Sequence, residues 1–112
     1  MSREWRLRIE DILEAISNIR EDIGDLNFDA FLKDRKTRNS VVRELQIIGE
    51  AARYIPLNIE LRYSAIPWKL MRGMRNVVVH EYFGVDWSII WQTAQLNLPP
   101  LVSKLQQILE ES

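Results

Sequence analysis

The sequence predicts an all-α protein, folded as an antiparallel up-and-down four-helix bundle with one or two extra short helices. In four long segments the apolar residues recur at the 3.6-residue spacing of a helix face, and no segment reads convincingly as a strand. Glycines, prolines and capping residues separate these segments by short connections. The chain has 112 residues, enough for one core, so we expect a single domain over residues 1–112.

The first predicted helix covers residues 4–24 and carries a wide apolar stripe. Ser2 is a suitable N-cap for this helix, and Gly24 is a suitable stop. Asn27 can cap a short helix, which holds Phe28, Phe31 and Leu32.

The next helical pattern covers residues 36–55, and Pro56 should end it because a proline ring lacks the backbone N–H that a helix needs. Gly49, Ala51 and Ala52 are small. They would allow another helix to approach this one closely.

Residues 57–66 should be irregular or form a short turn of helix. Pro67 suits the first position of the following helix, where an N–H would have no partner. That helix should end near His80. The run Val77-Val78-Val79 is β-branched, but no nearby segment offers it a strand partner, so we predict helix there.

The last long helix should begin after Asp86, a good N-cap that follows a chain break at Gly84. It should reach about Glu110. Pro99-Pro100 should kink or divide it, because both rings remove backbone donors.

Composition excludes several classes of function. The chain has no cysteine, which removes disulfides, thiolate metal sites and cysteine nucleophiles, and its single histidine rules out a histidine metal cluster within one chain. We therefore expect no metal and no cofactor. There is no P-loop and no nucleophile-elbow serine. The longest uncharged stretch, Trp87 to Ser103, contains polar residues and prolines, so it predicts a buried helix in a cytoplasmic protein and not a membrane span.

Charge is distributed unevenly along the chain. The net charge is −1, yet residues 61–80 contain no acid, while Arg62, Lys69, Arg72 and Arg75 are basic. A local positive patch can hold a phosphate chain on a nearly neutral protein, and Lys69 and Arg72 are then candidates for binding RNA. The alternative is a solvated helix face that happens to lack acids.

Candidate chemistry is concentrated in residues 75–82, which contain Arg75, His80 and Tyr82. Histidine can give or take a proton near neutral pH, and arginine can hold a phosphate through two parallel hydrogen bonds. The 2′-hydroxyl of RNA is a built-in nucleophile, so a site of this kind needs no metal.

The spacing of Arg75 and His80 limits what one chain can do. They are five residues apart, which corresponds to roughly 140° around a regular helix. Both reach one phosphate only if the helix ends between them or a second chain contributes. A two-fold homodimer would supply two arginines and two histidines, and so a separate acid and base. The alternative is that Arg75 pairs with a carboxylate while His80 and Tyr82 form a helix cap.

The segment Arg75–Tyr82 resembles the R-x4-6-H-x-Y motif of HepT-like proteins, which belong to the HEPN superfamily of helical toxin ribonucleases. Asn76 provides the polar residue that follows the arginine. Other segments match that family in the same order: Ile47–Ala52 (its IGEA segment), Ile66-Pro67-Trp68, Met74-Arg75-Asn76, His80–Phe83 and Val85-Asp86.

The resemblance implies a helical dimer that cleaves RNA without metal in a cleft between protomers. It implies catalytic roles for Arg75, His80 and Asn76. It also implies a partner, a small MntA-like nucleotidyltransferase antitoxin that silences the toxin by transferring AMP to Tyr82. Two other hypotheses stay open: a non-catalytic subunit that presents nucleotide or substrate to a nucleotidyltransferase, and a purely structural dimer. Glu50 could touch the site, or it could be a surface charge or the partner of an arginine.

Overall fold

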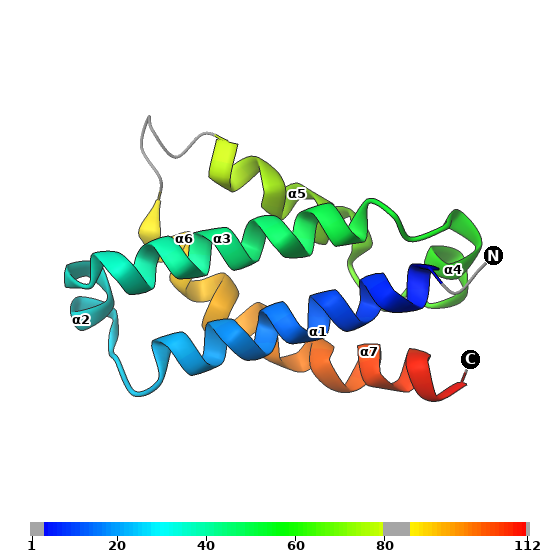
Figure 1. The fold of residues 1–112 in the computed structure, drawn as a ribbon, viewed down its shortest axis with the longest axis horizontal. Coiled ribbons are helices and arrows are strands. Elements are labelled where there is room, and N and C mark those ends of the chain that lie inside the picture. Colours follow the sequence, from blue (N-terminus) through cyan, green and yellow to red (C-terminus); the bar gives the residue numbers. More distant parts are fainter. Residues whose placement is uncertain (1–3, 80–85, 112) are drawn as a thin grey trace.

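The computed structural model describes residues 4–79 and 86–111, and these residues are helical without any strand (Figure 1). This confirms the all-α prediction, including helix at Val77–Val79. The longer helices are α1 (Glu4–Ile23), α3 (Arg35–Ala52), α5 (Trp68–Val79) and α7 (Pro99–Glu111). The shorter ones are α2 (Phe28–Lys33), α4 (Leu57–Arg62), α6 (Trp87–Gln92) and the π-helical turn η2 (Thr93–Asn97). The closed four-helix bundle and the dimer stay predictions.

Three predicted helix boundaries are confirmed. Gly24 has a φ of +52°, a conformation that favours glycine, and its N–H donates to the Arg20 carbonyl at 2.9 Å. The Asn27 side chain accepts from the Ala30 N–H at 2.9 Å and so caps α2. Asp86 caps α6 by accepting from the Ser88 N–H at 3.0 Å. The predicted cap at Ser2 and the break at Gly84 lie outside the described residues.

The junction between α2 and α3 depends on Asp34, which the sequence analysis did not identify. Its N–H donates to the Phe31 carbonyl and closes α2, while its carboxylate accepts from the Thr37 N–H at 3.0 Å and caps α3. That bond from the Thr37 backbone lowers the pKa of the Asp34 carboxyl, because it favours the charged form.

Helix α3 ends earlier than predicted, at Ala52 and not at the residue before Pro56. The N–H groups of Arg53, Tyr54 and Ile55 each bond the carbonyl three residues back, at 3.1–3.3 Å, so the chain tightens before the proline. Proline disfavours the α conformation at the residue before it, here Ile55, so the helix could not continue to Pro56 in any case.

The C-terminal helix is divided, as predicted from Pro99-Pro100. The turn η2 separates α6 from α7, and the Leu98 N–H reaches back to the Thr93 carbonyl at 3.0 Å. The wider turn accommodates the missing donors of the two prolines.

The longer helices run in alternating directions along the long axis of the molecule (Figure 1). Helix α3 packs against α1 and α5, and α1 also packs against α7. The largest fully buried side chains form one core: Ile9, Ile12, Ile16, Ile19, Phe31, Leu45, Ile48, Met71, Ile90, Leu98, Leu105 and Ile108.

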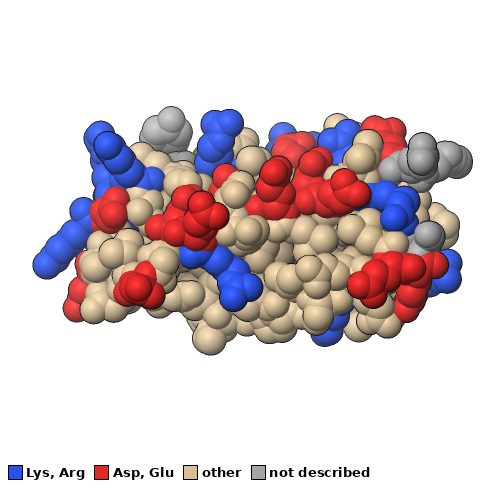
Figure 2. Space-filling view, turned by 60° about the horizontal axis from the view of Figure 1, so that its bottom comes forward, with Lys and Arg blue, Asp and Glu red and all other residues tan. Residues whose placement is uncertain are grey.

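The tryptophans lie in this core or pack against it. Trp68 is buried, and Trp87 and Trp91 pack their rings against Phe31. On the surface, acidic and basic side chains are interspersed over the face shown in Figure 2. None of the described helices is long and apolar enough to cross a bilayer.

Candidate active site on helix α5

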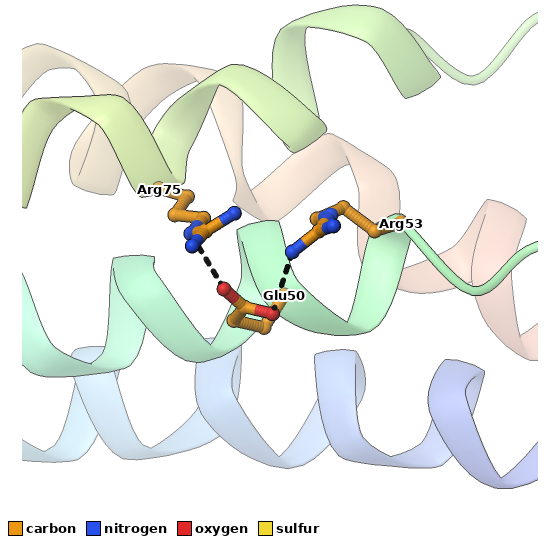
Figure 3. A network of polar contacts seen from close by, with 3 residues as sticks. All are labelled: Glu50, Arg53 and Arg75. Atoms are coloured by element: carbon orange, nitrogen blue, oxygen red, sulfur yellow. Dashed lines mark hydrogen bonds and ion pairs between the residues drawn. The ribbon is translucent and has the colours of Figure 1, made fainter.

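Helix α5 carries four of the predicted site residues, Lys69, Arg72, Arg75 and Asn76. The other two, His80 and Tyr82, lie outside the described residues. Of the four, Lys69 and Asn76 are exposed, and Arg72 and Arg75 are partly exposed. The polar network that the structure forms around them joins Arg75 to Glu50 and Arg53, two residues from the end of α3 (Figure 3).

The start of α5 is fixed by burial and by a hydrogen bond. Trp68 and Met71 lie one turn apart and are almost fully buried, so this face of the helix is anchored in the core. The Trp68 indole N–H also donates to the Tyr63 carbonyl at 3.1 Å. These contacts set the rotation of α5 and therefore decide which of its residues face α3.

The backbones of α3 and α5 approach each other closely at Gly49 and Arg75. A Cβ atom added to Gly49 would lie 2.5 Å from the Arg75 backbone nitrogen and 2.9 Å from its Cβ, closer than real Cβ atoms come. Only glycine permits this crossing without a backbone shift. The prediction that small residues on this segment admit a neighbouring helix is confirmed, and Arg75 is the residue that approaches.

Glu50 follows Gly49 and holds the Arg75 side chain. The Arg75 Nε lies 2.6 Å from one carboxylate oxygen of Glu50, and the Arg53 Nη1 lies 3.3 Å from the other (Figure 3). The side chains of Arg75 and Glu50 are 41% and 37% exposed, so solvent reaches the pair. Glu50 is thus the partner of an arginine, one of the roles that its sequence position allowed. Arg75 pairs with a carboxylate, as the alternative to a catalytic role predicted.

This arrangement leaves Arg75 able to meet an anion. A guanidinium has five N–H donors, and the contact with Glu50 is made through Nε, so the two Nη groups carry the other four. The trio of two arginines and one glutamate has a formal charge of +1. A phosphate that approached the Nη groups would meet a positive site whose side chain is already oriented.

Arg72 is also paired, but with a different helix. Its guanidinium contacts the Glu60 carboxylate of α4, which is only 17% exposed. This ion pair ties α4 to α5 on a part of the chain that contains no acid after Glu60 until Glu81.

Asp86 caps α6, the helix that follows residues 80–85 in the sequence. A hydrogen bond from the Ser88 hydroxyl, helped by backbone N–H groups of α6, lowers the pKa of the Asp86 carboxyl.

The described residues do not gather three or more His, Asp or Glu side chains at one point that could hold a metal ion. The sequence analysis missed Arg53 as a member of the Glu50 network. Its spacing of three residues after Glu50 was the available signal, since side chains at i and i+3 are neighbours on a helix.

Comparison with known proteins identifies the family. Residues 12–108 match the family described as "Ribonuclease HepT-like". The chain is 40% identical to "Probable ribonuclease HepT" of Thermococcus cleftensis, covering 96% of this chain and 98% of that protein. It is 35% identical to a "Putative RNase" of Methanocaldococcus jannaschii, covering 97% and 90%. The search of solved structures found no significant match. With the match spanning most of its length, the chain belongs to the ribonuclease HepT-like family.

Proposed function

We propose that this protein is a metal-independent endoribonuclease, the toxin of a pair whose other member is a small nucleotidyltransferase antitoxin. The observation that carries the proposal is Arg75, an oriented arginine that is still open to solvent, in a chain of the ribonuclease HepT-like family. The relatives named above as ribonucleases support RNA as the substrate.

In the proposed reaction the 2′-oxygen of RNA attacks the neighbouring phosphorus. Arg75 binds the non-bridging phosphate oxygens and stabilises the negative charge that builds up on them. His80 takes the proton from the 2′-hydroxyl or gives one to the departing 5′-oxygen, and Asn76 orients the site by hydrogen bonding. The P–O5′ bond breaks, leaving a 2′,3′-cyclic phosphate and a 5′-hydroxyl, so no water or metal enters the cleavage step.

One chain supplies one histidine, while the reaction needs both a base and an acid. A two-fold homodimer with the cleft between protomers would provide the second. We therefore propose that the active form is a dimer, with Arg75 and His80 near the interface.

Glu50 supports this role of Arg75 by restricting its side chain. A free arginine has many rotamers, and ordering them on binding costs free energy. The ion pair at Nε removes part of that cost before RNA arrives. Lys69 and Arg72, on the same helix, would add attraction for the RNA backbone.

We propose that the antitoxin controls the site by transferring AMP from ATP to the Tyr82 hydroxyl, with release of pyrophosphate. The added group brings negative charge and bulk to the place that an RNA phosphate must occupy. Mass spectrometry after co-expression with the proposed nucleotidyltransferase antitoxin tests this. AMP on Tyr82 with loss of cleavage is the expected result; a silenced protein with unmodified Tyr82 would refute it.

The proposed activity is tested by incubating purified protein with total RNA and with a defined oligonucleotide in excess chelator. We expect cleavage with 2′,3′-cyclic phosphate ends. His80→Ala should lower the rate by about 10² to 10⁴, the usual effect of removing a general acid or base. Cleavage by His80→Ala at the parent rate would contradict the assignment of His80. A protein that binds RNA without cutting it would instead favour a non-catalytic binding subunit.

A further inference from the structure

A pocket between α1 and α3 shares Glu50 with the Arg75 network. Its volume is about 290 Å³, near the lower end of the range for small-molecule sites, which suits one small planar group and not a larger ligand. It is lined by Arg8, Asp11, Arg43, Gln46, Ile47, Glu50 and Ala51. Because Glu50 also contacts Arg75, the pocket and the proposed phosphate site are separated by a single side chain.

The walls of the pocket are chemically divided. Ile47 and Ala51 are apolar and pack against the core, so they offer a surface to the face of a flat ring. Around them, the side chains of Asp11, Arg43 and Gln46 make no hydrogen bond or ion pair with any described residue. The rim therefore has donors and an acceptor that are free to bind the polar edge of a ligand.

Arg8 lines the pocket, and its guanidinium is held over the Tyr54 ring at 4.4 Å and pairs with Glu4 at 3.3 Å. Its Nε is buried and has no hydrogen-bond partner among the described residues. Because that atom is closed off from solvent, a ligand in the open pocket would meet the positive charge of the guanidinium and not this N–H.

We propose that this pocket binds one nucleobase of the RNA substrate, belonging to a nucleotide next to the phosphate that Arg75 holds. The inference rests on the proposed ribonuclease function and adds a base subsite to it. Arg8 and Arg43 line the pocket, and Arg53 and Arg75 belong to the trio beside it. These four arginines outnumber the three acids at the same place, Glu4, Asp11 and Glu50, which favours a ligand that carries phosphate. An apolar floor of Ile47 and Ala51 with a polar rim fits a base, whose faces are apolar and whose edges form hydrogen bonds.

The acids of the rim give the pocket a preference. Asp11 and Glu50 accept hydrogen bonds, and the exocyclic amino groups of adenine, cytosine and guanine donate them. Uracil and thymine lack an exocyclic amino group, and their single edge donor, the ring N3–H, lies between two carbonyl acceptors that the carboxylates would repel. The pocket should therefore favour bases that carry an amino group.

A second pocket provides a matched control. It lies between α1 and α7, has a volume of about 260 Å³, and also has an arginine and a glutamine, Arg20 and Gln106. Its remaining lining residues are Leu13, Ile16, Ser17 and Val102, which include no acid and no member of the Arg75 network.

The test uses the full-length protein with methyl-labelled isoleucine, alanine and valine, observed by NMR. The probes are the 2′-deoxydinucleotides of adenine, cytosine, guanine and thymine, which lack the 2′-hydroxyl and cannot be cut, and inorganic phosphate. We expect saturable shifts of the Ile47 and Ala51 methyl resonances with the first three, weaker shifts with the thymine probe and none with phosphate. The Ile16 and Val102 resonances should stay in place.

Variants assign the binding to the pocket. Arg43→Ala/Gln46→Ala should weaken binding of the cytosine probe roughly tenfold, the loss expected for one or two charged hydrogen bonds. Arg20→Ala/Gln106→Ala should leave it unchanged. All four side chains are exposed, so both double variants should keep the parent's unfolding temperature.

The proposed base subsite would be refuted if the Ile47 and Ala51 resonances did not shift with any dinucleotide. It would also be refuted if the two double variants changed the affinity equally. The binding measurement needs no cleavage, so its outcome is independent of the proposed activity. RNA cleavage without these shifts would refute the pocket alone, whereas base binding in a protein that never cuts RNA would refute the ribonuclease and leave the base site standing.

Discussion

Arg72 and Arg75 lie about one turn apart on α5, and each is paired with a glutamate, but the two pairs differ in setting. Glu60, the partner of Arg72, comes from the preceding helix and is 17% exposed. Glu50, the partner of Arg75, comes from α3, is 37% exposed and divides its two oxygens between Arg75 and Arg53.

This difference shows that an ion pair does not by itself define a role. The Arg72 pair joins two helices that are adjacent in sequence and withdraws its carboxylate from solvent. The Arg75 pair is open, and open ion pairs contribute only about 0–1 kcal/mol, so an incoming phosphate can engage Arg75 at little cost. We therefore propose that Arg75 takes part in catalysis and that Arg72 only attracts the RNA backbone.

Removing Arg75 should have the largest effect on activity. Arg75→Ala should lower the single-turnover cleavage rate by about 10² to 10³, as the loss of one transition-state donor does elsewhere. Stability should fall by no more than about 1 kcal/mol, because the ion pair is exposed. Rapid-mixing cleavage assays and chemical denaturation measure the two quantities; a rate within tenfold of the parent would remove Arg75 from the mechanism.

Changing the crossing at Gly49 should affect stability and activity together. Gly49→Ala places a methyl group against the Arg75 backbone and should destabilise the fold by about 1–3 kcal/mol, the usual cost of overpacking. It should also slow cleavage, since α5 must shift.

Gly73 is the matched control on α5, because an added Cβ would meet no atom within 4 Å. Gly73→Ala should stabilise the fold by about 0.5–1 kcal/mol through a better helix propensity. If the two alanine variants changed the free energy of unfolding equally, the close approach of α5 would not explain why position 49 is a glycine.

Neutralising Glu50 and Glu60 in separate variants should distinguish the positioning of Arg75 from the stabilisation of the α4–α5 contact. Glu50→Gln keeps the shape but weakens the hold on Arg75 and removes a negative charge beside the phosphate site. We expect a several-fold lower kcat together with a lower KM. Glu60→Gln should leave kcat unchanged and lower the melting temperature, because it alters a mostly buried partner. Steady-state kinetics and thermal unfolding distinguish them, and identical kcat values would refute the positioning role of Glu50.

Arg72→Ala should have the smallest effect on activity. If Arg72 only attracts the RNA backbone, KM should rise two- to threefold with kcat unchanged, and the slope of log affinity against log salt should decrease by about 0.7 for a single strand. Lys69→Ala, which removes an exposed charge from the same helix, should behave alike. A large loss of kcat in either variant would be incompatible with this assignment.

Local rules predicted most helix ends, because a cap or a stop depends on a few adjacent residues. Each predicted stop, cap or break lies at an element boundary in the structure: Gly24 ends α1, Asn27 and Asp86 cap α2 and α6, and Pro99-Pro100 begins α7. The end of α3 was predicted too late, because the hydrogen bonds from Arg53, Tyr54 and Ile55 span three residues and not the four of an α-helix.

The site was less predictable than the helices. The motif drew attention to Arg75, but its pairing with Glu50 depends on how α3 and α5 cross, and a crossing is set by the packing of residues such as Trp68 and Met71. The spacing of Arg75 and His80 requires a second chain unless the helix ends between them, and a second chain depends on contacts that one sequence does not specify.

The most direct test compares the parent, Arg75→Ala and Arg72→Ala proteins on one end-labelled RNA, in excess chelator and again with Mg²⁺. We expect the parent to cut equally well in both buffers, Arg72→Ala to reach the parent rate at saturating enzyme, and Arg75→Ala to remain about 10² to 10³ slower in both. Cleavage that requires Mg²⁺, or an equal loss in the two arginine variants, would contradict a metal-independent site built on Arg75.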